Sequence, residues 1–458
     1  MVPAVAQGIY EANLATENSI VRVWPSNDRE VIIYNETSSG NGGFLLYTIG
    51  SSIAKHIDLP KGISVRDFEI MGDEVWFCGE YNDPNFSSGS CGAVGTFNIP
   101  NTFTGNNVIN YRTLTTAVGV QGDNVFVTSL ARLDLFWYGG FTVMAMVGDS
   151  YIYDELTMPR STVVSAFFSP GGLGSGWWTV CALLDKDSTA LFTDIAALDN
   201  VVTAVGTAVD GTKLKAKTFY KDLFFPNHPV VSHFGDSIAC FDPIGKALII
   251  HTIYDEAAVV QLDVKAYTLL HIFDFASGNA IPTFMTRITD DPQSIYAAPW
   301  DMQEVRYNLT SDTINVLEYG VLPGGSTFET LLWTFPRAIS STLEPVQPMT
   351  LVTQASMDVA IDGHPVTVGE VQSSGLLDIH SFSPGLPYIN PNDPTPIVAP
   401  TEPLLELDAC TDYAEIPNNE EEPIVHQIII DDNGPTWYFD NNEYNPELTE
   451  IEFNQICE

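Results

Sequence analysis

Hydrophobic positions along this chain come in short runs that are separated by glycine, asparagine, aspartate and serine. Typical runs are REVIIYN, GGFLLYTIG, DEVWFCGEY, DNVFVTSLA and KALIIHTIYD. β-Branched and aromatic residues between turn-forming residues are typical of strands joined by hairpins. Apolar positions at helical spacing are nearly absent, and only YEANLAT and TDIAALDNVVTAV are compatible with helices. The pattern therefore predicts an all-β protein.

A loose unit recurs along the chain: an apolar pair, a turn with glycine or aspartate, and a β-rich run. It begins near Asp67, Ala117, Ser165, Thr203, Ser232 and Thr286. The spacing, about 30 to 55 residues, matches one four-stranded propeller blade. Several β-sandwiches or a β-helix would also give short strands, but a sandwich predicts no recurring unit. We therefore predict a β-propeller of six to eight four-stranded blades with an acidic, β-containing C-terminal tail.

The composition predicts three regions. Residues 1–383 form the propeller, and 338–383 are its last blade or a small β module. Residues 384–403 are proline-rich and predict an extended connector. Residues 404–458 are acidic and contain a hairpin candidate, HQIIIDDNGPTWYFD, with a Gly-Pro turn. We expect this last segment to be an assembly element that adds strands to a sheet edge, on the same molecule or on a neighbour.

One unit carries a family resemblance. The segment SVRDFEIMGDEVWFCGEYNDPNFSSGSCGAVGTFNI, residues 64–99, combines an apolar strand, a turn, a V-x-F-C-G strand and a G-x-x-G-x-F-x-I strand. It resembles a unit that recurs in β-propeller-like surface proteins of Bacteroidetes. The resemblance implies a propeller fold and a surface location, and it assigns no functional residues.

The charge of the chain is strongly unbalanced, with 58 acidic residues, 18 basic residues and a net charge of −40. No lysine or arginine follows Arg337. Such a surface excludes nucleic-acid binding, which needs basic residues to displace counterions, and it disfavours anionic membranes. No apolar stretch is long enough to span a bilayer. The expected partners are other protein subunits, through self-association or through a basic partner surface.

The N-terminal segment MVPAVAQGIYEANL has neither a basic region nor an apolar core, so we expect no signal peptide in this chain. Either a signal has been removed, or the protein reaches its place without one, as a virion protein would. The expected location is extracellular, on a cell surface or on a virus particle.

Four of the six cysteines are candidates for disulfides. Cys78 and Cys91 flank the polar stretch NDPNFSSGS, and a hairpin there would place them on neighbouring strands. Cys410 and Cys457 bracket the acidic tail and could close it as a loop. The alternative for all six is a free thiol.

Candidate ligand-binding residues are few. Asp431, Asp432, Asp440 and Glu443 cluster hard oxygen ligands suited to calcium, although they do not match an EF-hand and also fit a solvated acidic hairpin. No other cofactor is expected. Trp177 and Trp178 could stack on a sugar or form a buried pair within a blade.

Catalytic signatures are missing from the sequence. G-x-S-x-G and H-E-x-x-H do not occur. Sialidases, which are propellers, need clustered arginines for a carboxylate, and this chain has only nine arginines and lacks their Asp-containing turn. Paired carboxylates for glycoside hydrolysis stay open, because their separation depends on the fold. We therefore predict a non-catalytic structural, adhesive or interaction module; the alternative is a carbohydrate-binding or carbohydrate-cleaving propeller, a lectin or a glycosidase.

Overall fold

The structure is a computed structural model of the chain. It describes residues 8–10, 19–26, 30–36, 42–48, 54–82, 89–104, 109–116, 118–120, 123–138, 140–152, 160–170, 176–183, 190–198, 201–208, 214–220, 243–251, 256–263, 268–274, 284–287, 301–321, 328–337, 349–351, 356–359, 363, 365–371, 376–381, 425–431 and 434–439.

Seven antiparallel sheets of three to five strands follow one another within these residues. The first comprises β2 (Ser19–Val23), β3 (Glu30–Glu36), β4 (Gly42–Thr48) and β5 (Ala54–Asp58). The second comprises β6 (Ile63–Met71), β7 (Glu74–Asn82), β8 (Ser90–Asn98) and β9 (Asn110–Thr113). The third comprises β10 (Val118–Val120), β11 (Asp123–Tyr138), β12 (Phe141–Ile152), β13 (Arg160–Ser169) and β14 (Trp177–Leu183). A short helix, α1 (Ile99–Phe103), follows β8.

The remaining four sheets continue the same arrangement. The fourth comprises β15 (Ala190–Leu198), β16 (Val201–Ala208) and β17 (Leu214–Tyr220). The fifth comprises β18 (Pro243–His251), β19 (Glu256–Asp263), β20 (Thr268–Asp274) and β21 (Phe284–Arg287). The sixth comprises β22 (Asp301–Asn308), β23 (Thr313–Val321), β24 (Phe328–Pro336) and β25 (Met349–Leu351). The seventh comprises β26 (Ser356–Val359), β27 (Pro365–Val371), β28 (Leu376–Ser381) and β1 (Gly8–Tyr10).

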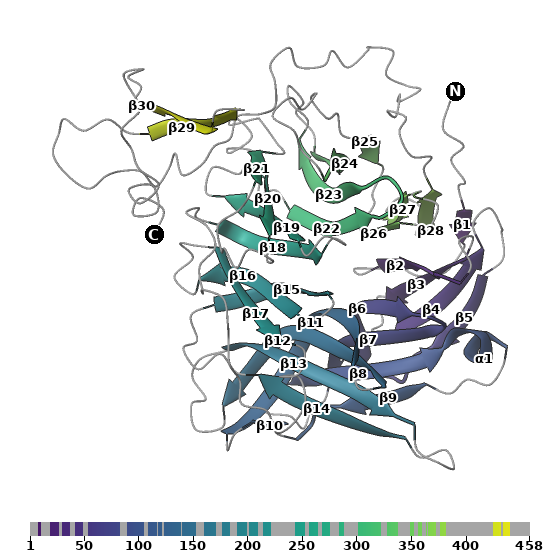
Figure 1. The fold of residues 1–458 in the computed structure, drawn as a ribbon. Helices are drawn as coiled ribbons and strands as arrows, with labels where there is room; N and C mark the ends of the chain where they lie inside the picture. Colours follow the sequence, from purple (N-terminus) through teal and green to yellow (C-terminus); the bar gives the residue numbers. More distant parts are fainter. Residues whose placement is uncertain are drawn as a thin grey trace.

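The sheets are the blades of a β-propeller (Figure 1). Their innermost strands β2, β6, β11, β15, β18, β22 and β26 contact one another in this order, and β26 contacts β2. The ring is therefore closed. It is closed by both ends of the domain, because the N-terminal β1 pairs with β28 of the last blade. The fold class expected from the recurring units is confirmed.

Two local expectations are wrong. The segment TDIAALDNVVTAV, which is compatible with a helix, instead forms the hairpin of β15 and β16. Its valines, threonines and alanines fit a β-strand because both faces of the blade are covered. In the tail, β29 (Val425–Asp431) pairs with β30 (Gly434–Phe439), and Asp431 lies opposite Gly434. The predicted hairpin is confirmed, but Gly434 and Pro435 lie in its second strand rather than in its turn.

A bulge and a glycine recur in three blades. In β6, β11 and β15 the ladder register shifts by one residue just before Asp67, Arg132 and Asp194. The partner strand carries a glycine there, because an added Cβ would lie within about 2 Å of a carbonyl oxygen on the bulged strand. These glycines are Gly79, Gly148 and Gly206. Because bulges re-aim side chains, the repeat turns a charged residue toward the propeller axis.

Replacing Gly148 with alanine tests this requirement for close approach. The new Cβ would lie 2.1 Å from the carbonyl oxygen of Ser129, so the inner strand must shift. We expect the free energy of unfolding to fall by about 1–3 kcal/mol, as for other overpacked interiors. Gly92→Ala is the control, since its added Cβ would meet no backbone atom, only the side chains of Val127, Leu114 and Leu130 at 2.9 to 3.4 Å. Equal losses in the two variants, measured by urea unfolding, would contradict the clash.

The core lies between neighbouring blades. Between the first and second blades, the Phe44 ring centroid lies 5.2 Å from that of Phe68 and 5.0 Å from that of Phe97, both edge-to-face. The Phe77 ring centroid lies 5.7 Å from that of Phe44. All four side chains are buried. Aromatic side chains bury large areas, so these contacts hold one blade against the next and fix the inner strands around the axis.

Candidate functional site on the propeller axis

Charged side chains from five inner strands meet at the centre of the ring. Glu304 of β22 is the hub, and its side chain is only 9% exposed. Its carboxylate lies 3.7 Å from Arg22 of β2, 3.3 Å from Arg132 of β11 and 3.5 Å from Arg306. In the ring, β11 and β22 are three blades apart in one direction and four in the other. The network therefore bridges opposite sides of the propeller.

A second set of carboxylates completes the pairing. Arg22 donates from Nη2 to Asp67 at 2.7 Å and from Nε to Glu69 at 2.8 Å. Arg306 lies 2.8 Å from Glu69 and 3.7 Å from Asp358. The guanidinium of Arg22 also lies 5.5 Å from the centre of the Phe68 ring. The side chain of Arg22 is 1% exposed. The buried Arg22 is thus paired with carboxylates on two sides, as a buried charge requires. In the following paragraphs, the axial network means Arg22, Asp67, Glu69, Arg132, Glu304, Arg306 and Asp358.

Four aspartates link consecutive blades through the backbone. Asp67 accepts from the N–H of Leu133 at 3.0 Å, and Asp134 accepts from Ala197 at 2.6 Å. Asp194 accepts from the N–H of Ile249 at 2.9 Å, and Asp358 accepts from Val23 at 2.7 Å. Each acceptor lies on one inner strand, and each donor lies on the next inner strand round the ring. The last of these bonds joins the seventh blade to the first and so supports closure.

The surroundings set the protonation of these groups. Burial by itself raises the pKa of Glu304, but the three neighbouring arginines hold it at about 2, so it is ionised. Burial raises the pKa of Asp134 to about 7 and that of Asp194 to about 6. Glu69 adds repulsion at Asp134, whereas Arg132 partly offsets the effect of burial at Asp194. The axis therefore combines one strongly ionised hub with two carboxyls that titrate near neutral pH.

The side chains of this arrangement hold the blades together. Two carboxyl groups with different pKa values are typical of the active sites of glycoside hydrolases. Here, however, Asp134 accepts backbone N–H groups on both oxygens, from Leu135 and Ala197. Asp194 does the same with Ile195 and Ile249. The arginines converge on the protein's own carboxylates, so each charge already has a partner inside the fold.

The predicted cysteine pair is not a disulfide. Cys78 lies on β7 and Cys91 on β8, so the two do occupy neighbouring strands of one blade. Both remain thiols. The register explains why: Cys78 lies opposite Val94, three residues from Cys91, and an odd offset places the two side chains on opposite faces of the sheet. Burial raises the pKa of Cys78 well above its ordinary value, which makes it an unreactive core residue.

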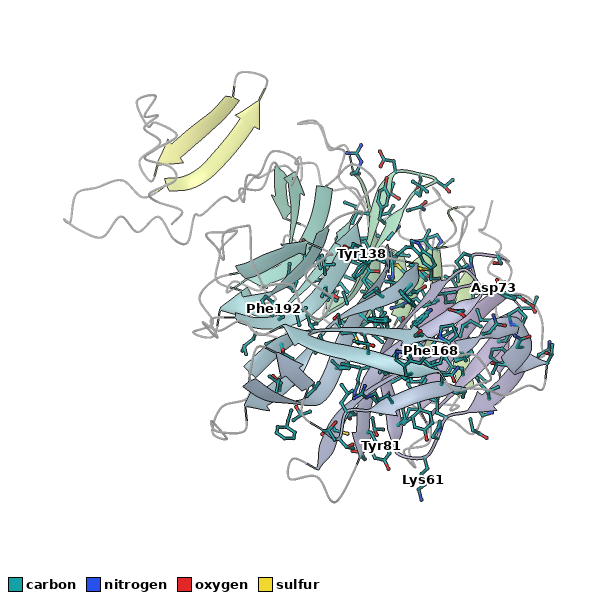
Figure 2. All side chains as sticks on the ribbon, turned by 60° about the horizontal axis from the view of Figure 1, so that its bottom comes forward. Lys61, Asp73, Tyr81, Tyr138, Phe168 and Phe192 are labelled. Carbon is teal, nitrogen blue, oxygen red and sulfur yellow. The ribbon has the colours of Figure 1, made fainter. Side chains whose placement is uncertain are left out.

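The two candidate stacking tryptophans are separated by the pleat of β14. Trp178 packs inward, with ring centroids 5.9 Å from Trp76 and 5.3 Å from Phe168. It therefore joins the core between the second and third blades. Trp177 is 59% exposed. Of the predicted pair, only Trp177 is available to a ligand. Phe168, which is labelled in Figure 2, belongs to β13 of the third sheet.

The tail residues give no test of the calcium prediction. Asp432, Asp440, Glu443, Cys410 and Cys457 lie outside the described residues, and of Asp431 only the backbone is described. In the part of the chain that is described, no group of three or more histidine, cysteine or acidic residues is placed to hold a metal ion. No helix there is long and apolar enough to cross a membrane.

Sequence reasoning missed the axial network. The signal was nevertheless in the chain: charged residues stand inside otherwise apolar strands, as in SIVRV and LFTDIAAL. A charge at a buried strand position needs a partner, so each such residue marks a site of pairing. What the strand sequences do not show is the partner, because the pairs join residues from strands far apart in the chain.

The fold and its axis together define a β-propeller with an internally paired centre. No protein-family model and no curated protein matches the chain. Among solved structures, it is similar to the β-propeller domain of the Trilobed protease from Pyrococcus furiosus, with 8% identity over 82% of this chain and 99% of that chain and a TM-score of 0.43. It is also similar to the BP39L lectin from Burkholderia pseudomallei, with 10% identity over 81% and 98% of the two chains and a TM-score of 0.48.

A third similar structure is the Trypanosoma rangeli sialidase in complex with the inhibitor DANA. The identity is 9% over 84% of this chain and 60% of that chain, with a TM-score of 0.40. Similarities this distant do not bear on function, so the functional argument rests on the residues of this chain.

Proposed function

We propose that the protein is a non-catalytic β-propeller that serves as a structural, adhesive or interaction module. The proposal rests on one observation: the charged side chains of the axial network pair with one another inside the protein. The centre of the ring is where chemistry-bearing side chains gather, and there the three arginines pair with the carboxylates around them. Two further carboxyls are occupied by backbone N–H groups. A centre built this way holds blades together.

The charge of the chain is compatible with the surroundings that we propose for this module. A net charge of −40 keeps the outer surface solvated and disfavours nucleic acids and anionic membranes. We place the module outside the cytoplasm, on a cell surface, in an extracellular assembly or on a virus particle. Its partners are other protein subunits, including copies of itself, and the C-terminal hairpin of β29 and β30 is an assembly element.

Carbohydrate binding is the second candidate, and one observation favours it. Trp177 presents 59% of its surface to solvent at the start of β14. An exposed indole is a large apolar surface on which a sugar ring can stack. Lectin function would use this outer strand rather than the axis, and it would require no change in the axial network.

A glycan array combined with a hydrolysis screen against plant and mucin polysaccharides tests both proposals, alongside sedimentation velocity of the full chain. The structural proposal predicts concentration-dependent association and no released sugar. Glycan binding that is lost in Trp177→Ala, and kept in the control Trp137→Ala at another exposed tryptophan, would favour the lectin. Cleavage of any glycan at enzymatic turnover rates would overturn the non-catalytic function.

A further inference from the structure

Three arginines from three blades share the carboxylate of Glu304. Its Oε1 accepts from Nη1 of Arg132 at 3.4 Å and lies 3.5 Å from Nη2 of Arg306. Its Oε2 accepts from the same Arg132 nitrogen at 3.3 Å and lies 3.7 Å from Nη1 of Arg22. A guanidinium group suits a carboxylate because its N–H groups carry positive charge and point outward in one plane. Each oxygen of this carboxylate is therefore held by two arginines.

Two of the three arginines are also fixed by other partners. Arg22 donates to the carbonyl oxygen of Val21 at 2.8 Å and to Asp67 at 2.7 Å. Arg306 lies 2.8 Å from the carboxylate of Glu69, which also accepts from Nε of Arg22 at 2.8 Å. Groups that are already in place bind a ligand at a smaller cost in entropy. We therefore expect these two guanidinium groups to keep their positions when the shared carboxylate is removed.

Arg132 depends on the shared carboxylate to balance its charge. Its Nη2 donates to the backbone carbonyl oxygen of Gln303 at 2.8 Å, a contact that orients the guanidinium but supplies no negative charge. Among the described residues, Arg132 forms its ion pair with Glu304, and the Arg132 side chain is only 14% exposed. A buried charge that loses its partner is costly. A cavity in place of the Glu304 side chain would therefore attract an anion.

We propose that the three arginines form a binding site for a small carboxylate, and that the chain fills this site with its own Glu304. The inference goes beyond the proposed function. Replacing Glu304 with alanine removes the γ-carbon and the carboxylate, and acetate has the same non-hydrogen atoms as the removed group. Acetate therefore matches the site in size, shape and charge. In the parent protein the attached carboxylate leaves no room there for one from outside.

Thermal unfolding of Glu304→Ala in acetate tests the site. The variant is refolded from urea in sodium acetate or in sodium chloride at equal ionic strength, so that the anion can enter as the ring closes. A ligand that binds only the folded state raises the melting temperature as its concentration increases. We expect acetate to raise the melting temperature of Glu304→Ala by several degrees above that in chloride, with saturation.

Glu304→Gln is the matched control. It removes the same charge, but its amide occupies the space that acetate would need, so its melting temperature should be equal in acetate and in chloride. Propionate is a second control on Glu304→Ala. It is one methylene longer than the removed group, and a close-packed interior does not accommodate the extra carbon. Propionate should therefore raise the melting temperature less than acetate does.

A second measurement locates the bound anion. Carbon NMR with carboxyl-¹³C acetate should show a bound resonance in Glu304→Ala and none in the parent protein, whose site is filled. The double variant Glu304→Ala/Arg132→Met removes the arginine that the cavity leaves without a carboxylate. We expect it to lose both the bound resonance and the response of the melting temperature to acetate.

Several outcomes would overturn the carboxylate site. One is an equal melting temperature of Glu304→Ala in acetate and in chloride. Another is an equal rise in Glu304→Ala and Glu304→Gln, which would be a general effect of the salt. If Glu304→Ala does not fold in chloride, acetate should restore the circular dichroism of the β fold, and failure to do so also overturns the site. Glycan binding and self-association are measured separately, so the proposed function stands or falls independently of these results.

Discussion

Replacing Arg22 with methionine is expected to lower the free energy of unfolding by about 3–5 kcal/mol, the range found when one partner of a buried ion pair is removed. The guanidinium is 1% exposed and contacts Asp67, Glu69 and Glu304. Methionine keeps much of the volume but leaves these carboxylates without a partner from β2. Chemical denaturation monitored by circular dichroism measures the loss.

Arg66→Met is the matched control. Arg66 lies on β6 of the neighbouring second blade and pairs with Glu80, but its side chain is 44% exposed. Exposed ion pairs contribute about 0–1 kcal/mol because water screens them, so this variant should remain close to the parent protein. If the two variants lose the same stability, the axial network is not what holds the inner strands together.

The melting temperature is expected to rise by several degrees as the pH falls from 8 to 5. Burial raises the pKa of Asp134 to about 7 and that of Asp194 to about 6, against about 3.9 for an unfolded aspartate. Between these values the folded state binds more protons than the unfolded state, so stability falls as the pH rises. For a shift of this size the contribution is on the order of a few kcal/mol at each site.

The opposite trend sets in at lower pH. The arginines hold the pKa of Glu304 at about 2, below its ordinary value of 4.5, so its stabilising contribution is lost as the pH falls from about 4.5 to 2. Stability should therefore be greatest near pH 5. Differential scanning calorimetry across this range measures the profile directly.

Asp134→Asn separates this effect from the general relief of negative charge. The variant should lose a large part of the rise between pH 8 and pH 5, because the titrating carboxyl is gone. Asp58→Asn removes one acid at a side chain that is 86% exposed, and it should leave the rise intact. An unchanged profile in Asp134→Asn would show that the acidic surface, rather than the blade contacts, causes the pH dependence.

Strand positions followed from local chemistry. The turn at Gly72 and Asp73 joins β6 to β7 as the G-D pattern predicted, with Gly72 at a φ of 63°. Such turns depend on the backbone freedom of a few residues and so can be predicted from the sequence. The hairpin of β15 and β16 was mistaken for a candidate helix, because alanines and valines fit either structure until the neighbouring blades cover both faces.

By itself the sequence determined an all-β chain, a recurring unit of blade length and an acidic tail with a hairpin, because these depend on short-range pattern and composition. Only the tertiary structure decided which charges meet. Arg22 and Glu304 are 282 positions apart in the sequence, yet closure of the ring brings them to 3.7 Å. Closure likewise set the partner of β1, and the register of β7 with β8 placed Cys78 and Cys91 on opposite faces of their sheet. Such pairings follow from ring geometry and strand register, to which residues far apart in the chain contribute jointly.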